Sequence, residues 1–100
     1  MIKHIVSWTL KDQAEGADKA SNIKIMLAKL ESCRGIVPGM HVFELSTAAA
    51  GLEFTADIAL YSEFESREAL AAYQVHPTHK AILPFVGAVR ETRQCLDYEV

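Results

Sequence analysis

Three side chains capable of proton transfer, Tyr73, His76 and His79, lie within one short stretch of the sequence. Imidazole titrates near neutral pH, and a neighbouring phenol can orient it or stabilise a developing enolate oxygen. Tyr73 and His79 are therefore candidates for general acid–base catalysis. A structural interpretation is equally open, in which a hydrogen bond between Tyr73 and His79 only joins two helical segments.

The same stretch predicts a break between two helices. Ser66 is a favourable N-cap residue for a helix whose last turn contains Tyr73. Pro77 disfavours helical dihedral angles at the preceding residue, but its fixed φ suits the first position of a new helix. We therefore expect His76 to be a hinge and cap, with Tyr73 and His79 approaching each other across the bend.

The composition indicates a single domain over residues 1–100, with half of the residues apolar and a formal charge of −3. The lack of a Lys/Arg cluster argues against nucleic acid as a partner, and no apolar run reaches the ~20 residues of a membrane span. The N-terminus enters a strand pattern without a signal-peptide layout, so we expect a cytoplasmic protein. Cys33 and Cys95 show no metal or redox spacing and are expected to be reduced.

Hydrophobic periodicity predicts the secondary structure. The expected elements are a strand over 2–10, a helix over 18–33, a strand over 40–46, a strand over 54–62, a helix from 66 that bends at 76–77, and a strand over 92–100. The first strand turns His4 toward an apolar face with Trp8. The stripe of the first helix consists of Ala20, Ile23, Leu27, Leu30 and Cys33, with Met26 widening it.

Further signals concern turns and breaks. Val37-Pro38-Gly39 has turn chemistry, and the small residues 47–51 predict a loop between two strands. The strand over 54–62 is largely apolar on both faces, which predicts a central position in the sheet. Pro84 is expected to kink or interrupt the second helical segment.

The order strand, helix, strand, strand, helix, strand predicts a ferredoxin-like α+β fold, with a four-stranded antiparallel sheet covered by helices on one face. We assign apolar residues to the uncovered face, namely Val6, Trp8, Ile58 and Leu60. Exposure of each would cost about 1.5–3 kcal/mol relative to burial. We therefore expect a homodimer that packs sheet against sheet around an apolar cavity.

Several stretches resemble the stress-responsive A/B barrel family, usually called Dabb. They are Ile2-Lys3-His4-Ile5-Val6-Ser7-Trp8, the turn Val37-Pro38-Gly39-Met40, and the run from Phe64-Glu65-Ser66 through Ala69-Leu70, Tyr73 and His76-Pro77-Thr78-His79 to Phe85-Val86. The resemblance covers nearly the whole chain, and its most specific part is a Tyr followed by His-Pro-x-His at this spacing. It implies a dimeric α/β barrel.

The resemblance implies less about activity. Most members of the family have no assigned reaction, some plant members are stress-associated proteins, and one kind is a polyketide cyclase that performs an intramolecular aldol condensation without a cofactor. In that cyclase type a tyrosine and the second histidine of His-Pro-x-His transfer protons, and the matching residues are Tyr73 and His79. A first-strand histidine matches His4, whereas a third-strand histidine of such cyclases falls near Ile58, which departs from their pattern.

Two functions follow. The first is a dimeric protein that binds a small apolar or aromatic oxygenated molecule in the barrel and, in the cyclase interpretation, converts it without a cofactor. Its catalytic residues would be Tyr73 and His79, and its ligand-binding residues His4, Val6, Trp8, Phe54, Ile58 and His76. The second function is that of a non-enzymatic stress-responsive or interaction protein with a packed barrel, in which His4 is a hydrogen-bonded core residue.

Metal and cofactor sites receive little support from the sequence. His76 and His79 are spaced i, i+3, and a metal site would need a carboxylate such as Glu44 or Asp57 from elsewhere in the chain. We therefore expect no metal, no heme and no other cofactor. Arg90 and Arg93 are interpreted as part of a solvated strand edge.

Overall fold

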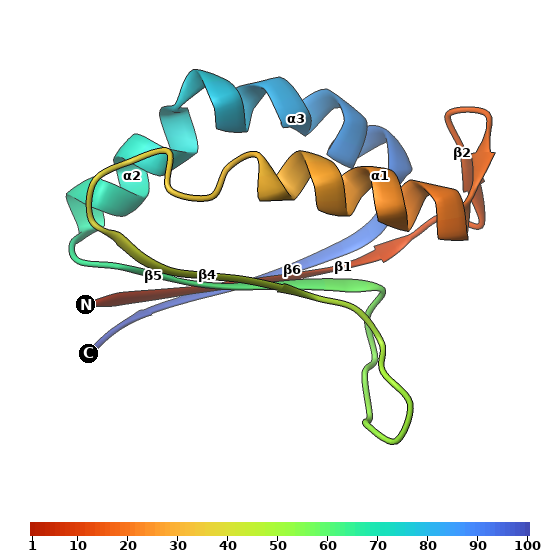
Figure 1. Cartoon of the computed structure of the whole chain (residues 1–100), viewed down its shortest axis with the longest axis horizontal. Helices are drawn as coiled ribbons and strands as arrows, with labels where there is room; N and C mark the ends of the chain where they lie inside the picture. The colour runs from red at the N-terminus through yellow and green to blue at the C-terminus, as the bar shows by residue number, and fades with distance from the viewer.

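The computed structural model of the chain describes residues 1–100 (Figure 1). The elements are β1 Ile2–Leu10, β2 Gln13–Ala14, β3 Ala17–Asp18, α1 Lys19–Glu31, β4 Met40–Ser46, β5 Ile58–Phe64, α2 Arg67–Val75, α3 Pro77–Val89 and β6 Arg90–Glu99. Apart from the β2–β3 hairpin, this is the predicted ferredoxin-like order. No helix has the length and apolar composition needed to cross a membrane.

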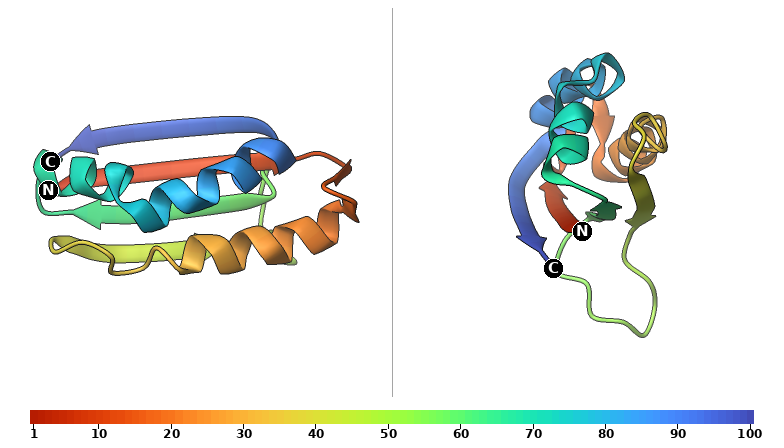
Figure 2. Two further views of the ribbon diagram at one scale, coloured as in Figure 1. Left: turned by 90° about the horizontal axis from the view of Figure 1, so that it is seen from above. Right: turned by 90° about the vertical axis from the view of Figure 1, so that its left-hand side faces the viewer.

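The four long strands form one antiparallel sheet in the order β4-β5-β1-β6. The strand β5 is central, as its two apolar faces predicted. All three helices lie on one face of the sheet, and β6 lies at the edge that the helices leave uncovered (Figure 2). The loop between β4 and β5 projects on the side opposite to the helices (Figure 1).

The core lies between the sheet and the helices. Alternate residues of β1 are buried, which confirms the predicted alternation. The assignment of Val6, Trp8, Ile58 and Leu60 to the uncovered face was wrong, because they are 0–5% exposed within the single chain and belong to its core. Side-chain alternation shows which residues share a face of a strand, but it does not show which face the helices will cover.

The uncovered face carries a different set of apolar residues. Ile5 lies on the opposite side of β1 from the core, and in register it pairs with Tyr61 of β5 and Leu96 of β6. Leu96 and Tyr98 are 57% and 42% exposed. This face is therefore less apolar than predicted, but it retains a row of apolar side chains across three strands.

The strand β5 starts four residues later than predicted and extends to Phe64. The preceding Asp57 anchors the β4–β5 loop, because its carboxylate accepts a hydrogen bond from Leu10 N at 2.7 Å and its backbone N–H donates to Trp8 O at 2.8 Å. Asp57 also forms an ion pair with Lys19 at 3.5 Å. These contacts hold residue 57 in place without ladder pairing.

The helix α1 starts after Asp18, whose side chain accepts a hydrogen bond from Ser21 N. Its buried residues are Asn22, Met26 and Leu30, so the buried stripe is rotated from the predicted one. Asn22 faces inward because its Nδ2 donates a hydrogen bond to Ala14 O at 2.9 Å. A polar residue thus takes an inward position that hydrophobic periodicity assigns to its apolar neighbours.

The unpredicted β2–β3 hairpin is closed by Glu15 and Gly16 with φ angles of 52° and 72°. Positive φ at both central residues is typical of a type I′ turn. The predicted turn at Val37-Pro38-Gly39 is confirmed, with Gly39 at φ 87°. A Cβ at Gly39 would lie 2.9 Å from Glu65 Cγ, so close packing as well as dihedral angle requires glycine there.

The helix α3 runs from Pro77 to Val89 without interruption at Pro84, so of the predicted kink or interruption the interruption is not found. Its residues Ile82, Val86 and Val89 are buried against the sheet. We attribute the continuity to this packing on both sides of Pro84, which offsets the hydrogen bond that proline cannot make.

Candidate functional site

The junction of α2 and α3 positions the site. Ser66 caps α2 by accepting a hydrogen bond from Ala69 N at 3.1 Å. His76 adopts extended dihedral angles (φ −61°, ψ 137°) and its Nδ1 accepts a hydrogen bond from Thr78 N at 3.1 Å, while Pro77 is the first residue of α3. The predicted hinge and cap at His76 are confirmed.

The bend places Tyr73 against His79, as predicted. Their ring centroids are 4.7 Å apart, with an angle of 49° between the ring planes. His79 Nδ1 donates a hydrogen bond to the backbone carbonyl of Gln74 at 3.1 Å, since only a protonated nitrogen can pair with that oxygen. The neutral ring therefore carries its lone pair on Nε2, which makes no hydrogen bond within the chain.

Burial sets the protonation states of this pair. It lowers the pKa of His79, and the charges of His4 and Arg93 lower it further, against the opposing effect of the Gln74 carbonyl. Burial also raises the pKa of the Tyr73 phenol well above its usual value, and the adjacent Cys33 thiol adds to this effect. At neutral pH the pair is thus an unprotonated imidazole beside a protonated phenol, a base and a hydrogen-bond donor.

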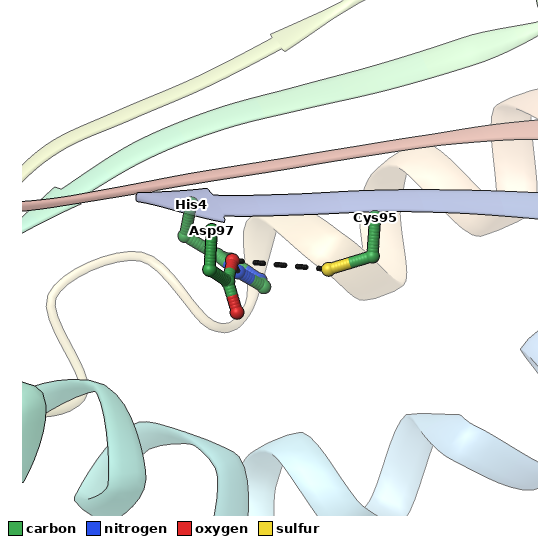
Figure 3. A group of neighbouring side chains, drawn as sticks. All are labelled: His4, Cys95 and Asp97. Atoms are coloured by element: carbon green, nitrogen blue, oxygen red, sulfur yellow. Dashed lines mark hydrogen bonds and ion pairs between the residues drawn. The ribbon is translucent and has the colours of Figure 1, made fainter. Parts of the chain in front are cut away.

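A second polar group lies beside this pair, formed by His4 on β1 with Asp97 and Cys95 on β6 (Figure 3). His4 is 4% exposed, and its Nδ1 donates a hydrogen bond to Asp97 Oδ1. Cys95 Sγ donates to the same oxygen at 3.8 Å. The His4 ring centroid is 6.4 Å from that of Tyr73, so Asp97 orients an imidazole next to the Tyr73–His79 pair.

The donor atoms of His4, Cys95 and Asp97 lie within 4.8 Å of one another. Nitrogen, sulfur and carboxylate oxygen are a ligand set that zinc accepts. In the structure these atoms are hydrogen-bonded to one another through Asp97 Oδ1. The set considered from the sequence is not assembled, because His76 Nδ1 is used in capping α3 and Asp57 anchors Leu10 and Lys19.

A cavity of about 240 Å³ lies between the sheet and the helices. Its lining residues are His4, Val6, Trp8, Leu30, Leu60, Tyr73, His79, Ile82, Leu83, Val86, Gly87, Arg90 and Arg93. Apolar side chains form most of the wall, and the imidazoles and the phenol described above contribute polar atoms. An apolar wall with a few convergent polar groups is typical of small-molecule sites.

Five residues proposed from the sequence line this cavity, namely His4, Val6, Trp8, Tyr73 and His79. Phe54, Ile58 and His76 do not line it. Phe54 precedes β5, Ile58 is fully buried in the core, and His76 caps α3.

Sequence reasoning missed Asp97 and the two arginines of the cavity wall. Arg93 is paired in register with Trp8, and Asp97 with His4, so both share the helix-side face of the sheet. The alternation of β6 contains this signal, because it groups Arg93, Cys95 and Asp97 on one face. Only the register with β1 shows that this face is the one that carries His4 and Trp8.

The model of the Stress Responsive A/B Barrel Domain family, Dabb, matches residues 2–100. No curated protein matches the chain. Among solved structures, a dimeric ferredoxin-like protein of unknown function from Thermobifida fusca has a TM-score of 0.84 at 17% identity, over 99% of this chain and 90% of that one.

Two further structures are similar over nearly the whole of both chains. A dimeric protein of unknown function with a ferredoxin-like fold from Bacteroides fragilis has a TM-score of 0.76 at 27% identity, over 99% of this chain and 95% of that one. A Dabb family protein from Mesorhizobium loti has a TM-score of 0.74 at 24% identity, with the same coverage of 99% and 95%.

Proposed function

The chain belongs to the stress-responsive A/B barrel (Dabb) family, and we propose that it binds a small apolar or aromatic oxygenated molecule in the cavity beneath α3. The observation that carries this proposal is the convergence of His4, Tyr73 and His79 on one largely apolar cavity. A packed barrel would not need three protonatable side chains on the wall of a space of about 240 Å³. The site is therefore suited to a molecule with both apolar surface and oxygen atoms.

We further propose that the site transfers protons without a cofactor. His79 Nε2 would remove a proton from a carbon next to a carbonyl group, and the Tyr73 hydroxyl would donate a hydrogen bond to the enolate oxygen that develops. The resulting carbanion adds to a second carbonyl of the same molecule, and the new alkoxide takes back a proton from the His79 imidazolium. His4, oriented by Asp97, is placed beside Tyr73 and can hold a second oxygen of the ligand.

The assembly proposed with this function is a homodimer that pairs the uncovered sheet faces. Similar ferredoxin-like proteins are described as dimeric, and the row formed by Ile5, Tyr61 and Leu96 gives this face apolar surface to bury. Burial of such side chains contributes about 25 cal/mol per Å².

Native mass spectrometry of freshly purified protein tests the binding proposal, with thermal shift measurements on a panel of aromatic and aliphatic ketones as the second readout. We expect a dimer mass with an added small molecule that is lost on denaturation, and a rise in Tm with the compounds that bind. A matched control is Gly87→Leu, because a Cβ at Gly87 meets no atom within 4 Å and the new side chain would fill the cavity.

A bare protein, together with no Tm shift across the panel, would contradict the proposal and favour a non-enzymatic interaction protein. Equal Tm shifts for the parent protein and Gly87→Leu would place binding outside the cavity.

A further inference from the structure

Two of the four arginines have no carboxylate partner, and both line the cavity. Arg34 pairs with Glu31, and Arg67 pairs with Glu99. Arg90 and Arg93 form no ion pair within the chain, although they lie on a strand with several acidic residues. Their positive charge is therefore directed at solvent and at the cavity.

Two carboxylates farther along β6, on the face of Arg93, are already in use. Asp97 accepts hydrogen bonds from His4 and Cys95 (Figure 3), and Glu99 binds Arg67 at 2.7 Å. The charge of Arg93 nevertheless reaches the site, because Arg93 is among the groups that lower the pKa of His79, after burial. The positive charge of Arg93 therefore acts on His79 in the cavity, and Arg93 forms no ion pair within the chain.

One further hydrogen-bond donor of the cavity wall is the Tyr73 hydroxyl, whereas the unprotonated Nε2 atoms of His4 and His79 are acceptors. Tyr73 is held as a neutral phenol by the burial that raises its pKa. A ligand that brings an oxygen acceptor would complement the Tyr73 hydroxyl.

The strand register separates the arginines from the proton-transfer groups. Arg93 is paired with Trp8 and Asp97 with His4, so the two ends are four positions apart along β1, about 13 Å of strand. Arg90 and Arg93 line the cavity and are exposed on β6, an edge strand of the sheet, so they lie at the cavity rim. A group held there would place the rest of the ligand along the apolar wall.

We propose that Arg90 and Arg93 bind a carboxylate of the ligand at the rim of the cavity, while its aromatic or apolar part extends inward toward Tyr73. The proposal rests on the proposed function and adds the substrate class, an aromatic or aliphatic acid. Guanidinium groups match carboxylates with two parallel hydrogen bonds.

The test uses two probes of the same shape, 4-pentylbenzoate and its neutral analogue 4-pentylbenzamide. Isothermal titration calorimetry at pH 7.5 measures both Kd values for the parent protein, for the double variant Arg90→Gln/Arg93→Gln and for Lys24→Gln. Lys24 is exposed on α1, forms no ion pair and does not line the cavity, so the last variant removes one positive charge from outside the cavity wall. It is the control for a general charge effect.

We expect the benzoate to bind the parent protein and Lys24→Gln about tenfold or more tightly than the benzamide, the range for hydrogen bonds to charged groups. The double variant should lose this preference, with benzamide affinity unchanged. Added salt should weaken only benzoate binding.

Three results would overturn the proposal. In the first, the parent protein binds 4-pentylbenzoate and 4-pentylbenzamide with equal affinity, and Gly87→Leu binds neither. This result would remove the carboxylate assignment but would still support binding in the cavity. Binding of neither probe would also remove the carboxylate assignment, and the native mass spectrum and the ketone panel would then decide whether the cavity binds a ligand at all. A change of oligomeric mass in the double variant would assign the arginines to the subunit interface instead of the ligand.

Discussion

His4 and Asp97 are 93 residues apart in the chain, yet the register of β1 and β6 pairs them and a hydrogen bond joins the imidazole Nδ1 to the carboxylate. The carboxylate fixes the orientation of a ring that is otherwise surrounded by aromatic side chains, with the Phe64 centroid at 6.3 Å and the Tyr73 centroid at 6.4 Å. Nδ1 carries the shared proton, and Nε2 has no hydrogen-bond partner in the chain.

Asp97→Ala should remove the hydrogen bond that fixes the orientation and tautomer of the His4 ring. We expect nitrogen NMR to show Nδ1 protonation of His4 in the parent protein and a mixture of tautomers in the variant. The free energy of unfolding should fall by about 1–2 kcal/mol, because a nearly buried donor loses its acceptor. Unchanged His4 resonances in the variant would show that the ring is held by packing alone.

The pH dependence of stability should report on His79. Its folded pKa is lowered by burial, so the unfolded chain binds more protons as pH falls, and unfolding becomes easier. The stabilising contribution is complete above the usual histidine pKa of about 6.5 and is lost as pH falls through the lower folded value. Urea titrations at pH 7.5 and pH 5 should show a smaller loss of stability in His79→Gln than in the parent protein. An equal loss in both proteins would assign the effect to other groups.

Tyr73→Phe separates the chemical role of the phenol from its packing. The ring is 1% exposed and packs against Phe64 at 5.2 Å between centroids, contacts that phenylalanine preserves. We expect the free energy of unfolding to change by no more than about 1 kcal/mol, whereas turnover or affinity for oxygenated ligands is lost. Loss of stability in Tyr73→Phe and His79→Ala with normal ligand binding would instead support a structural role for the pair.

The single tryptophan offers a direct test of where ligands bind, because Trp8 lines the cavity. We expect its fluorescence to change when a ligand enters the parent protein and to remain constant in Gly87→Leu. The variant should also be more stable by about 0.8–1 kcal/mol, since leucine has a higher helix propensity than glycine and meets no obstructing atom at Cβ. A marked loss of stability would mean that the cavity cannot accept the larger side chain.

The parts of the site that could be predicted depend on local signals. The cap at Ser66, the hinge at His76 and the approach of Tyr73 to His79 all follow from residues no more than six positions apart and from the fixed φ of Pro77. The resemblance to the Dabb family added the expectation of a dimeric barrel and of proton transfer by Tyr73 and His79, not the positions of the other side chains.

The parts that could not be predicted depend on long-range pairing. Asp97 joins His4, and Arg93 joins the cavity, only through the register of β6 with β1, which the alternation of either strand leaves undetermined. The face covered by the helices was also assigned wrongly, because Val6 and Trp8 share a face with His4 in either arrangement. The residues first expected to drive dimer formation are therefore buried within the single chain. The dimer must instead bury the row formed by Ile5, Tyr61 and Leu96 on the uncovered face.

Leu96→Lys tests whether the uncovered sheet face forms the subunit contact. Leu96 lies on the uncovered face opposite Ile5 and is 57% exposed in the single chain, so a charge there should prevent two sheets from packing together. We expect light scattering after size-exclusion chromatography to give the dimer mass for the parent protein and the monomer mass for the variant. Ile25→Lys is the matched control, because Ile25 is 41% exposed on α1 in the helical layer, and it should remain a dimer. A dimeric Leu96→Lys protein, or a monomeric Ile25→Lys protein, would place the subunit contact on the helices instead of on the sheet.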